Sequence, residues 1–434
     1  MLKNKNSLLS VFTCAFLGLS ISVTAGCKKQ EITYGQSRTD NRIVIWTDNS
    51  EFAPYIEYFN KTHQNKAVLI YKENPASALS SNQSDIQPDL VIGSWLVNEQ
   101  TKKYFEPLDY LFERKFISSQ DFYEVLLQVG KFSKRQYILP VSFNLPAIIF
   151  SRTNESYLED NYTISLEQLK RSGEAYNKKN KNGTFNTMGF APESNDNFLY
   201  LVTKIQGANY REIKGNYFTW EPSALLESIK FLENWINEAN GSSQIERDFV
   251  YKYLSVNDDK RVTQGKTLFA YTTSDKLFKL SKQQLSKIDY RWLQNEKKLP
   301  VEDSMLMMGI PKQTENHYGA AEFISWFYNP ETQQKLLERK FEMNLDTNKF
   351  GIANGFSAIR DVNEHILPVF YTTLLSNIPQ ADSFKVYDKK PLRWERIKQK
   401  VIIPYNKDSL TSNGTKKVLS IDERYSEWRK QGFN

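Results

Sequence analysis

Two short stretches of the chain combine a tryptophan with small polar side chains: Trp46-Thr47-Asp48-Asn49 and Ser94-Trp95. An indole ring can cover the apolar C–H face of a sugar ring, while carboxylate, amide and hydroxyl groups exchange hydrogen bonds with its hydroxyl rim. The same acidic and aromatic set also suits a cation such as a polyamine, through cation–π contact. The alternative roles are core packing for a tryptophan and helix capping for an aspartate. These residues indicate a site for a polar solute, and composition does not separate the two ligand classes.

Residues that could catalyse a reaction form no recognisable motif. The three histidines, His63, His317 and His365, lack the spacing of a metal site. Gly265-Lys266-Thr267 resembles the end of a phosphate-binding loop, but Lys260 stands where that loop needs its first glycine. No G-x-S-x-G nucleophile motif occurs. We therefore expect no cofactor, no metal and no enzymatic activity, although a glycan hydrolase stays open because its carboxylates need no local motif.

The polar turns follow segments that have the composition of buried strands. Ile43–Trp46, Ala67–Tyr71 and Leu90–Gly93 are continuously apolar, and an amphipathic helix pattern starts at Phe52. Such strands, alternating with helices, indicate an α/β fold whose sheet is covered on both faces. Open α/β sheets bind ligands at the carboxyl ends of their strands. The turns that carry the two tryptophans are therefore expected at a ligand-binding edge.

The rest of the chain continues the α/β pattern. Ser165 is expected to cap a helix that ends near Asn177, and Ser223 to cap a long amphipathic helix. The proline-punctuated segment 141–146 lies between two expected strands and indicates a crossing between domains. Further strands are expected at 137–140, 147–150, 268–271 and 305–310, and a further helix carries Ala320, Phe323, Ile324 and Phe327 on one face.

Composition favours two folded domains. The chain has 434 residues, of which 40% are hydrophobic and 14% aromatic, which is enough for two cores of ordinary size. The net charge of +7 is modest for this length, and the basic residues are scattered rather than clustered. Nucleic acid is therefore not an expected partner.

The N-terminus predicts export from the cytoplasm. Lys3 and Lys5 precede the apolar segment 8–23, which is too short for a membrane span, and Thr24-Ala25-Gly26-Cys27 follows. This ending resembles the lipobox of bacterial lipoproteins, although Thr24 stands where that motif usually has leucine. Residues 1–26 are thus expected to be a lipoprotein signal peptide. Cys27 would carry the lipid, including palmitate, and 27–41 would be a tether outside the cytoplasm.

Four further stretches resemble the extracellular solute-binding proteins of ABC transporters, family 1, a maltose-binding-protein-like family. The resemblance spans residues 42–360, most of the chain after the expected signal peptide, and the four stretches occur in the family's order. They are Ile43–Thr47 with Phe59–Thr62; Pro88–Gly93; Tyr137–Pro140 with Ile149–Arg152; and Gly309–Lys312 with Ala320–Ile324 and Asn329–Gln333.

The resemblance implies two α/β lobes, each a central sheet flanked by helices, with a ligand cleft between them. Lobe 1 would hold residues 42–142 and 303–348, and lobe 2 residues 146–300 and 349–434, with hinges near 141–146 and 300–303. The last 70 residues align with no part of the family. The expected ligand contacts are Trp46, Asp48, Asn49, Ser94, Trp95, Asn144, Asn195, Asp196, Asn197, Phe198, Thr272, Ser274, Asp275 and Phe356.

The expected function is that of a monomeric binding lipoprotein. It would capture a sugar or oligosaccharide by aromatic stacking and hydrogen bonds, and deliver it to an ABC permease in the membrane that holds the lipid on Cys27. Two other classes stay open: a lipid-anchored glycan hydrolase, and a surface adhesin or sensor that retains the fold.

Overall fold

The computed structural model describes residues 42–81, 86–213, 217–343, 349–412 and 417–431. These residues belong to one unit that begins at Arg38. The signal peptide, Cys27 and the tether at 27–41 lie outside the described residues and stay predictions. Within the described ranges, no helix combines the length and the apolar character needed to cross a bilayer.

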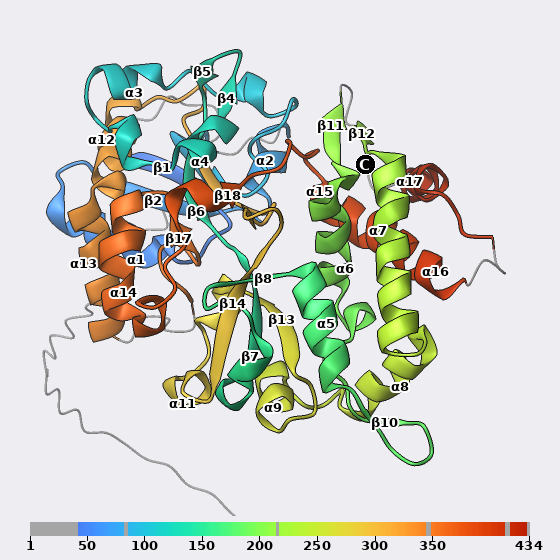
Figure 1. Cartoon of the computed structure of the whole chain (residues 1–434). Coiled ribbons are helices and arrows are strands. Elements are labelled where there is room, and N and C mark those ends of the chain that lie inside the picture. Colours follow the sequence, from blue (N-terminus) through green and yellow to red (C-terminus); the bar gives the residue numbers. More distant parts are fainter. Residues whose placement is uncertain (1–41, 82–85, 214–216, 344–348, 413–416, 432–434) are drawn as a thin grey trace, which may run out of the picture. The chain divides into compact units, whose positions relative to one another are not determined.

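A six-stranded sheet forms the centre of what we call the first lobe (Figure 1). The central pairs β1–β2 and β1–β3 are parallel, whereas β16 and β17 run antiparallel to β6. The strands expected at 43–46, 67–71 and 90–93 are confirmed. In spatial order the sheet contains β17 (Phe356–Ser357), β6 (Leu139–Phe143), β16 (Leu306–Gly309), β3 (Leu90–Gly93), β1 (Ile43–Thr47) and β2 (Ala67–Tyr71).

Helices pack on this sheet through the apolar faces that the sequence predicts. Phe52 and Phe59 of helix α1 (Phe52–Thr62) are fully buried, and their rings contact Phe327 and Phe323 of α12 (His317–Tyr328) at centroid distances of 5.5 and 5.1 Å. Burial of such aromatic rings is a large favourable contribution to folding.

The aspartate of the Pro-Asp motif at 88–89 connects three segments of the first lobe through hydrogen bonds. The Asp89 carboxylate is fully buried and accepts hydrogen bonds from the Val44 amide at 2.8 Å and from the Thr314 hydroxyl at 2.7 Å. The amides of Glu315 and Asn316 also donate to it, both at 3.1 Å. One carboxylate therefore joins the start of β3, strand β1 and the turn before α12.

A four-stranded sheet forms the centre of the second lobe. Strand β7 runs antiparallel to β13 and β14, and β8 runs parallel to β14. The sheet contains, in order, β13 (Phe269–Thr273), β7 (Pro146–Ser151), β14 (Ile288–Gln294) and β8 (Thr163–Ser165). The main helices of this lobe are α5 (Leu166–Tyr176), α6 (Asp196–Thr203), α7 (Pro222–Asn234), α8 (Ser243–Lys252) and α9 (Asp258–Thr263).

One expected helix cap is confirmed and one is wrong. The Ser165 side chain accepts the Gln168 amide at the start of α5. Helix α7, by contrast, begins at Pro222 with Glu221 in the capping position, so Ser223 lies inside the first turn. Proline fixes a helical φ and has no amide hydrogen to satisfy, which makes it well suited to the first helical position.

Three segments connect the lobes. The chain passes from β6 to β7 between Phe143 and Pro146, and from β15 (Leu299–Pro300) to β16 through residues 301–305. The third connection follows β18 (Phe384–Lys385), which pairs in parallel with β15, and leads to α15 (Trp394–Ile397). Buried aromatic residues also join the lobes, since Phe278 stacks on Phe350 at 4.5 Å.

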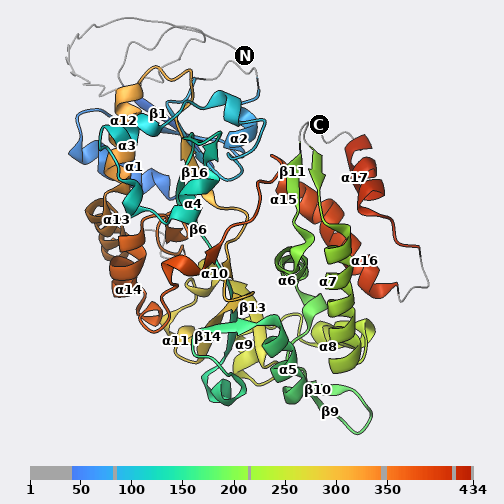
Figure 2. The same cartoon turned by 45° about the horizontal axis from the view of Figure 1, so that its top comes forward.

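The structure corrects the expected position of residues 349–385. The sequence interpretation places 349–434 in the second lobe, but Phe356 of β17 pairs with Phe143 in the first sheet. Phe350, Ile359 and nearby apolar residues belong to the same buried cluster as β1 and β3. The last part, with α15, α16 (Ile403–Thr411) and α17 (Ile421–Lys430), packs in the second lobe, beside α6 and α7 in Figure 2. The segment before it also contacts that lobe, because Tyr290 and Trp292 of β14 donate to the carbonyls of Thr373 and Asn377.

The remaining helices and strands complete the two lobes. The helices are α2 (Pro75–Ala78), α3 (Asp109–Glu113), α4 (Glu124–Val129), α10 (Ser274–Leu277), α11 (Lys282–Leu285), α13 (Pro330–Glu342) and α14 (Leu367–Phe370). The strands are β4 (Lys131–Phe132), β5 (Arg135–Gln136), β9 (Lys178–Lys179), β10 (Phe185–Thr187), β11 (Arg211–Ile213) and β12 (Tyr217–Thr219).

Candidate functional site

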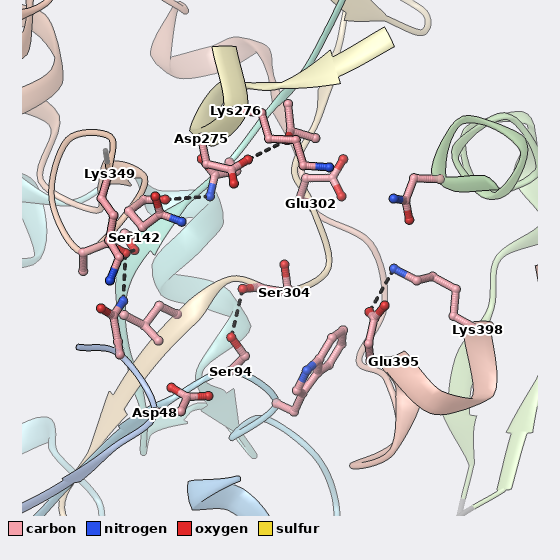
Figure 3. A pocket seen from close by; sticks show the side chains of 18 of the residues that line it. Asp48, Ser94, Ser142, Asp275, Lys276, Glu302, Ser304, Lys349, Glu395 and Lys398 are labelled. Carbon is pink, nitrogen blue, oxygen red and sulfur yellow. Dashed lines mark hydrogen bonds and ion pairs between the residues drawn. The ribbon is translucent and has the colours of Figure 1, made fainter. Parts of the chain in front are cut away.

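A cavity of about 550 Å³ is lined by residues from both lobes and from the connecting segments (Figure 3). This volume lies within the ordinary range for small-molecule sites. Half of the expected ligand contacts line it. They are Asp48, Asn49, Ser94, Trp95, Asn144, Asn197 and Asp275.

Three of the expected aromatic contacts lie in the hydrophobic core, which corrects their assignment to the ligand. Trp46, Phe198 and Phe356 are 4%, 0% and 1% exposed. Phe198 packs against Phe190 at 4.7 Å, and Phe356 against Phe350 at 5.0 Å. Their rings are used in packing the lobes and have no surface left for a solute.

Four expected polar contacts also lie away from the cavity lining. Asn195 caps α6 by accepting the amides of Asn197 and Phe198, and Asp196 forms an ion pair with Lys407 at 2.9 Å. Thr272 lies in β13 without lining the cavity, and Ser274 is fully buried. The Asn-Asp-Asn-Phe run is therefore a helix start that presents only Asn197 to the cavity.

Two asparagines of the lining position a neighbouring loop. Asn49 donates to the carbonyl of Ala353 and Asn144 to that of Asn354, both at 3.0 Å. Their side-chain oxygens are also occupied: Asn49 accepts the Glu51 amide and Asn144 accepts the Ser274 hydroxyl. Both amide groups are thus committed within the protein and shape the cavity floor.

The loop that these asparagines hold is strained and firmly anchored. Ala353 and Asn354 have φ values of 49° and 66°, in the left-handed region, which costs about 1–3 kcal/mol per residue. Beneath the loop, the buried Lys340 ammonium lies 3.1 Å from the Glu51 carboxylate and donates to the Lys349 carbonyl at 2.6 Å. This anchoring compensates for the unfavourable backbone.

Trp95 is held in an unusual conformation beside the cavity. It lies in the turn that follows β3, and its φ of 63° is left-handed, which is uncommon for a bulky side chain. Its carbonyl accepts a hydrogen bond from Asn98 at 2.7 Å. The partly buried ring packs against the core clusters of both lobes and also lines the cavity.

Charged side chains dominate the rest of the lining. Burial raises the pKa of Asp48 to about 6 and also raises the pKa of Glu302. The Tyr271 hydroxyl lies 3.4 Å from the Glu302 carboxylate. Lys398 and Glu395 form an ion pair at 2.9 Å, which is marked in Figure 3. The cavity is therefore lined mainly by polar and charged side chains, together with the indole ring of Trp95.

Sequence reasoning missed several lining residues in the second connection. Glu302 and Ser304 line the cavity, and the Ser304 carbonyl accepts the Ser94 hydroxyl at 3.1 Å. Glu302, Asp303 and Ser304 form a polar run between two apolar strands. That run, in a segment expected to be a hinge, is the signal that could have found them.

A buried ion pair supports this connection from behind the cavity. The Lys204 ammonium lies 2.9 Å from Asp303 and 3.0 Å from the Val301 carbonyl, and the Tyr200 hydroxyl also donates to Asp303. Burial alone would raise the pKa of Asp303, but Lys204 and Lys390 hold it well below its usual range. The pair fastens the connection to the second lobe.

The described part of the chain contains no group of three His, Cys, Asp or Glu side chains positioned to hold a metal ion. The histidines have local roles instead. His63 ends α1 and stacks on Phe59 at 4.2 Å, and His317 is the first residue of α12. The site therefore offers hydrogen bonds, charges and the aromatic side chains of Trp95 and Tyr271.

Solved structures with the same fold are distant in sequence. The sugar-binding protein MalE from Xanthomonas citri is 13% identical with a TM-score of 0.62, over 90% of this chain and 96% of that one. The GacH receptor of Streptomyces glaucescens is 11% identical with a TM-score of 0.58, over 92% and 100%. CpMnBP1, solved with mannotriose bound, is 17% identical with a TM-score of 0.54, over 86% and 96%. These likenesses establish the two-lobed α/β fold.

The sequence itself matches a family model described as "Bacterial extracellular solute-binding protein". The match runs over residues 55–341, which is more than half of the chain and includes β6, β7 and the second connection. The chain belongs to the bacterial extracellular solute-binding protein family.

Proposed function

We propose that this protein is the binding component of an ABC importer and that it captures a sugar or short oligosaccharide. The observation that carries the proposal is the cavity itself, in which Trp95 provides an apolar face and both lobes provide polar groups. The solved structures with this fold include the sugar-binding protein MalE and CpMnBP1 with mannotriose bound, which supports the same ligand class.

In this proposal the sugar ring stacks on Trp95, and its hydroxyls bond to Asp48, Asn197, Asp275 and Glu302. Those side chains come from β-strand ends, a helix start and a connecting segment. A ligand that contacts both lobes at once favours the closed conformation, in which the two lobes are close enough for all of these contacts to form. A permease that recognises this conformation would then distinguish loaded from empty protein.

The membrane attachment is also part of the proposal. Lipid on Cys27 and a tether of residues 27–41 would hold the protein outside the cytoplasm on a bacterial membrane, at its periplasmic face or at the cell surface, near its permease. About 14 residues of extended chain reach at most ~45–50 Å. The protein would therefore work as a monomer within short range of the transporter.

A thermal-shift screen tests the binding function. The unit that starts at Arg38 would be heated with mono- and oligosaccharides, polyamines, amino acids and phosphosugars. A ligand at 1,000 times its Kd adds about 4 kcal/mol to the free energy of unfolding. A saturable shift produced by a sugar that is not consumed is the expected result. Consumption of the sugar would indicate a hydrolase, and silence across the panel would favour an adhesin or sensor.

Two substitutions then locate the site. Trp95→Ala and Asp275→Ala should each weaken the sugar found in the screen at least tenfold. Tyr251→Ala is the matched control, because Tyr251 is 78% exposed and lies outside the cavity lining. Unchanged affinity in both cavity variants would refute the assignment of this cavity.

A further inference from the structure

Two carboxylates of the cavity lack a cationic partner. Asp48 and Glu302 both line it, and among the residues that the structure describes neither forms an ion pair. A lysine close to Glu302 in the buried network is engaged elsewhere, because Lys204 pairs with Asp303 at 2.9 Å. Both carboxylates are partly buried, so each has lost part of its hydration. The charges of Lys204 and Lys398 oppose the rise in the pKa of Glu302, whereas the pKa of Asp48 is set by burial and a backbone hydrogen bond.

The other charged groups of the lining are mostly neutralised locally. Lys398 pairs with Glu395 at 2.9 Å, and Asp275 with Lys279 at 3.7 Å. The Lys349 ammonium donates to the Ser50 hydroxyl, and Lys276 is exposed. The two carboxylates without an ion-pair partner are therefore the groups that a bound cation would change most.

Asp48 lies in the turn next to the one that carries Trp95. It directly follows β1, and Ser94-Trp95 directly follow β3. These strands are neighbours in the sheet, with Thr47 paired to Ile92, so the two turns emerge side by side. Figure 3 shows Asp48 and Ser94 on the same side of the cavity. A ring stacked on Trp95 would thus lie beside the turn that holds the Asp48 carboxylate.

Burial of a carboxylate is costly unless a positive charge accompanies it. A neutral hydroxyl offers one hydrogen bond, whereas an ammonium offers a charge-assisted bond of roughly twice the strength. Burial raises the pKa of Asp48, which is the change expected of a carboxylate whose charge has lost water without gaining a nearby positive charge. A cationic ligand would supply that compensation.

Building on the function proposed above, we infer that the solute is a sugar with a protonated amino group, which binds to Asp48 while the ring stacks on Trp95. Glu302 provides a second anionic position for another amino group. This assignment unites the two ligand chemistries that the tryptophan and carboxylate residues suit, a hydroxylated ring and a cation.

Matched sugars test the inference by calorimetry on the unit that starts at Arg38. The panel contains glucosamine, galactosamine, mannosamine and the chitosan disaccharide, each beside its N-acetyl and hydroxyl counterpart, with spermidine as a cation that lacks a ring. The amino member of at least one set should bind at least tenfold more tightly than both counterparts. Asp48→Asn should reduce that preference to about twofold or less, and Asp361→Asn, an exposed substitution outside the cavity, should leave it unchanged.

Dependence on pH gives an independent measurement. Because burial raises the pKa of Asp48 to about 6, affinity for the amino sugar should fall as the pH is lowered from 7 to 5, and less so in Asp48→Asn. The other charged groups that line the cavity are Lys349 before β17, Asp275 and Lys276 of α10, Glu302, Glu395 of α15 and Lys398. Added salt should also weaken the amino sugar more than its neutral counterparts.

Each remaining outcome is decisive. Equal affinity for amino, acetylated and hydroxyl members overturns the inference and leaves the proposed sugar-binding function intact. Binding of spermidine alone overturns both the sugar class and the amino-sugar inference. Preference for the amino member that survives in Asp48→Asn also overturns the assignment to Asp48.

Discussion

Replacing Asp303 with asparagine removes the carboxylate that pairs with a buried lysine in the second connection. The Lys204 side chain is 2% exposed and that of Asp303 is 9% exposed. Their 2.9 Å contact joins the continuation of α6 in the second lobe to the segment beside the cavity. Asparagine keeps the shape of the side chain but leaves the Lys204 ammonium without this anionic partner.

The expected loss is large because the charge stays buried. Removing one member of a buried pair typically costs 3–5 kcal/mol, whereas replacing both members by apolar groups is often neutral. Asp303→Asn should therefore lower the free energy of unfolding by about 3–5 kcal/mol. Adding Lys204→Met should restore most of the loss, which gives a coupling energy of about 2 kcal/mol or more.

Urea unfolding at pH 7 measures these changes, and an exposed pair supplies the control. Lys61 and Glu57 approach to 2.5 Å, but their side chains are 58% and 51% exposed, so Glu57→Gln should have an effect below about 0.5 kcal/mol. A loss under about 1 kcal/mol in Asp303→Asn, or no recovery in the double variant, would refute the role of this pair.

Acid unfolding offers a second test of the same pair. The unfolded carboxyl has a pKa of about 3.9, and Lys204 lowers the folded-state pKa below that value despite the opposing effect of burial. The stabilisation is therefore complete above about pH 4 and is lost as the pH falls further. Asp303→Asn should weaken the pH dependence of stability in that acid range.

Three further substitutions test other parts of the structure. Asp89→Ala removes the acceptor for three backbone amides and one hydroxyl, so it should cost about 3–5 kcal/mol in urea unfolding, and Asp89→Asn should cost less. Burial raises the pKa of Glu246 to about 8, so between about pH 4.5 and 8 this carboxyl is protonated in the folded state and ionised in the unfolded state. The free energy of unfolding of the wild type should therefore fall as the pH rises through this range, and Glu246→Gln should reduce that pH dependence. Phe198→Ala should cost about 3–5 kcal/mol without changing ligand affinity below the melting range, because the ring is fully buried. Weakened ligand binding in Phe198→Ala would contradict this interpretation and would indicate that Phe198 contacts the ligand.

The sequence is most informative where a physical constraint acts locally. The strands at 43–47 and 90–93 are buried along their whole length, so their apolar runs are continuous and easily recognised. Because ligands bind at the carboxyl ends of such strands, the amino-acid sequence alone is enough to place the turns that contain Asp48 and Trp95 at a ligand-binding edge.

Long-range pairing cannot be predicted in the same way. Strand β17 has only two residues, too few to show a period, and its partner β6 lies more than 200 residues earlier in the chain. The close approach depends on Gly355, where a Cβ atom would lie 2.7 Å from the Phe143 carbonyl oxygen. A glycine in a loop has many explanations, so the sequence pattern assigns residues 349–385 to the wrong lobe.

The amide and carboxylate side chains of this cavity differ in how many of their polar atoms are bonded to the protein. This difference decides how substitutions should be interpreted. Asn49 and Asn144 have both their donor and their acceptor atoms bonded to the protein. Loss of either would disturb the strained loop at Ala353 first and a solute only indirectly. Asp48 and Glu302 have no ion-pair partner among the described residues. A ligand in the cavity would therefore be able to form hydrogen bonds or an ion pair with them. Under the proposed function, substitutions of these two carboxylates should therefore change which solute binds, whereas substitutions of Asn49 and Asn144 should first change the loop, although all four residues line the same cavity.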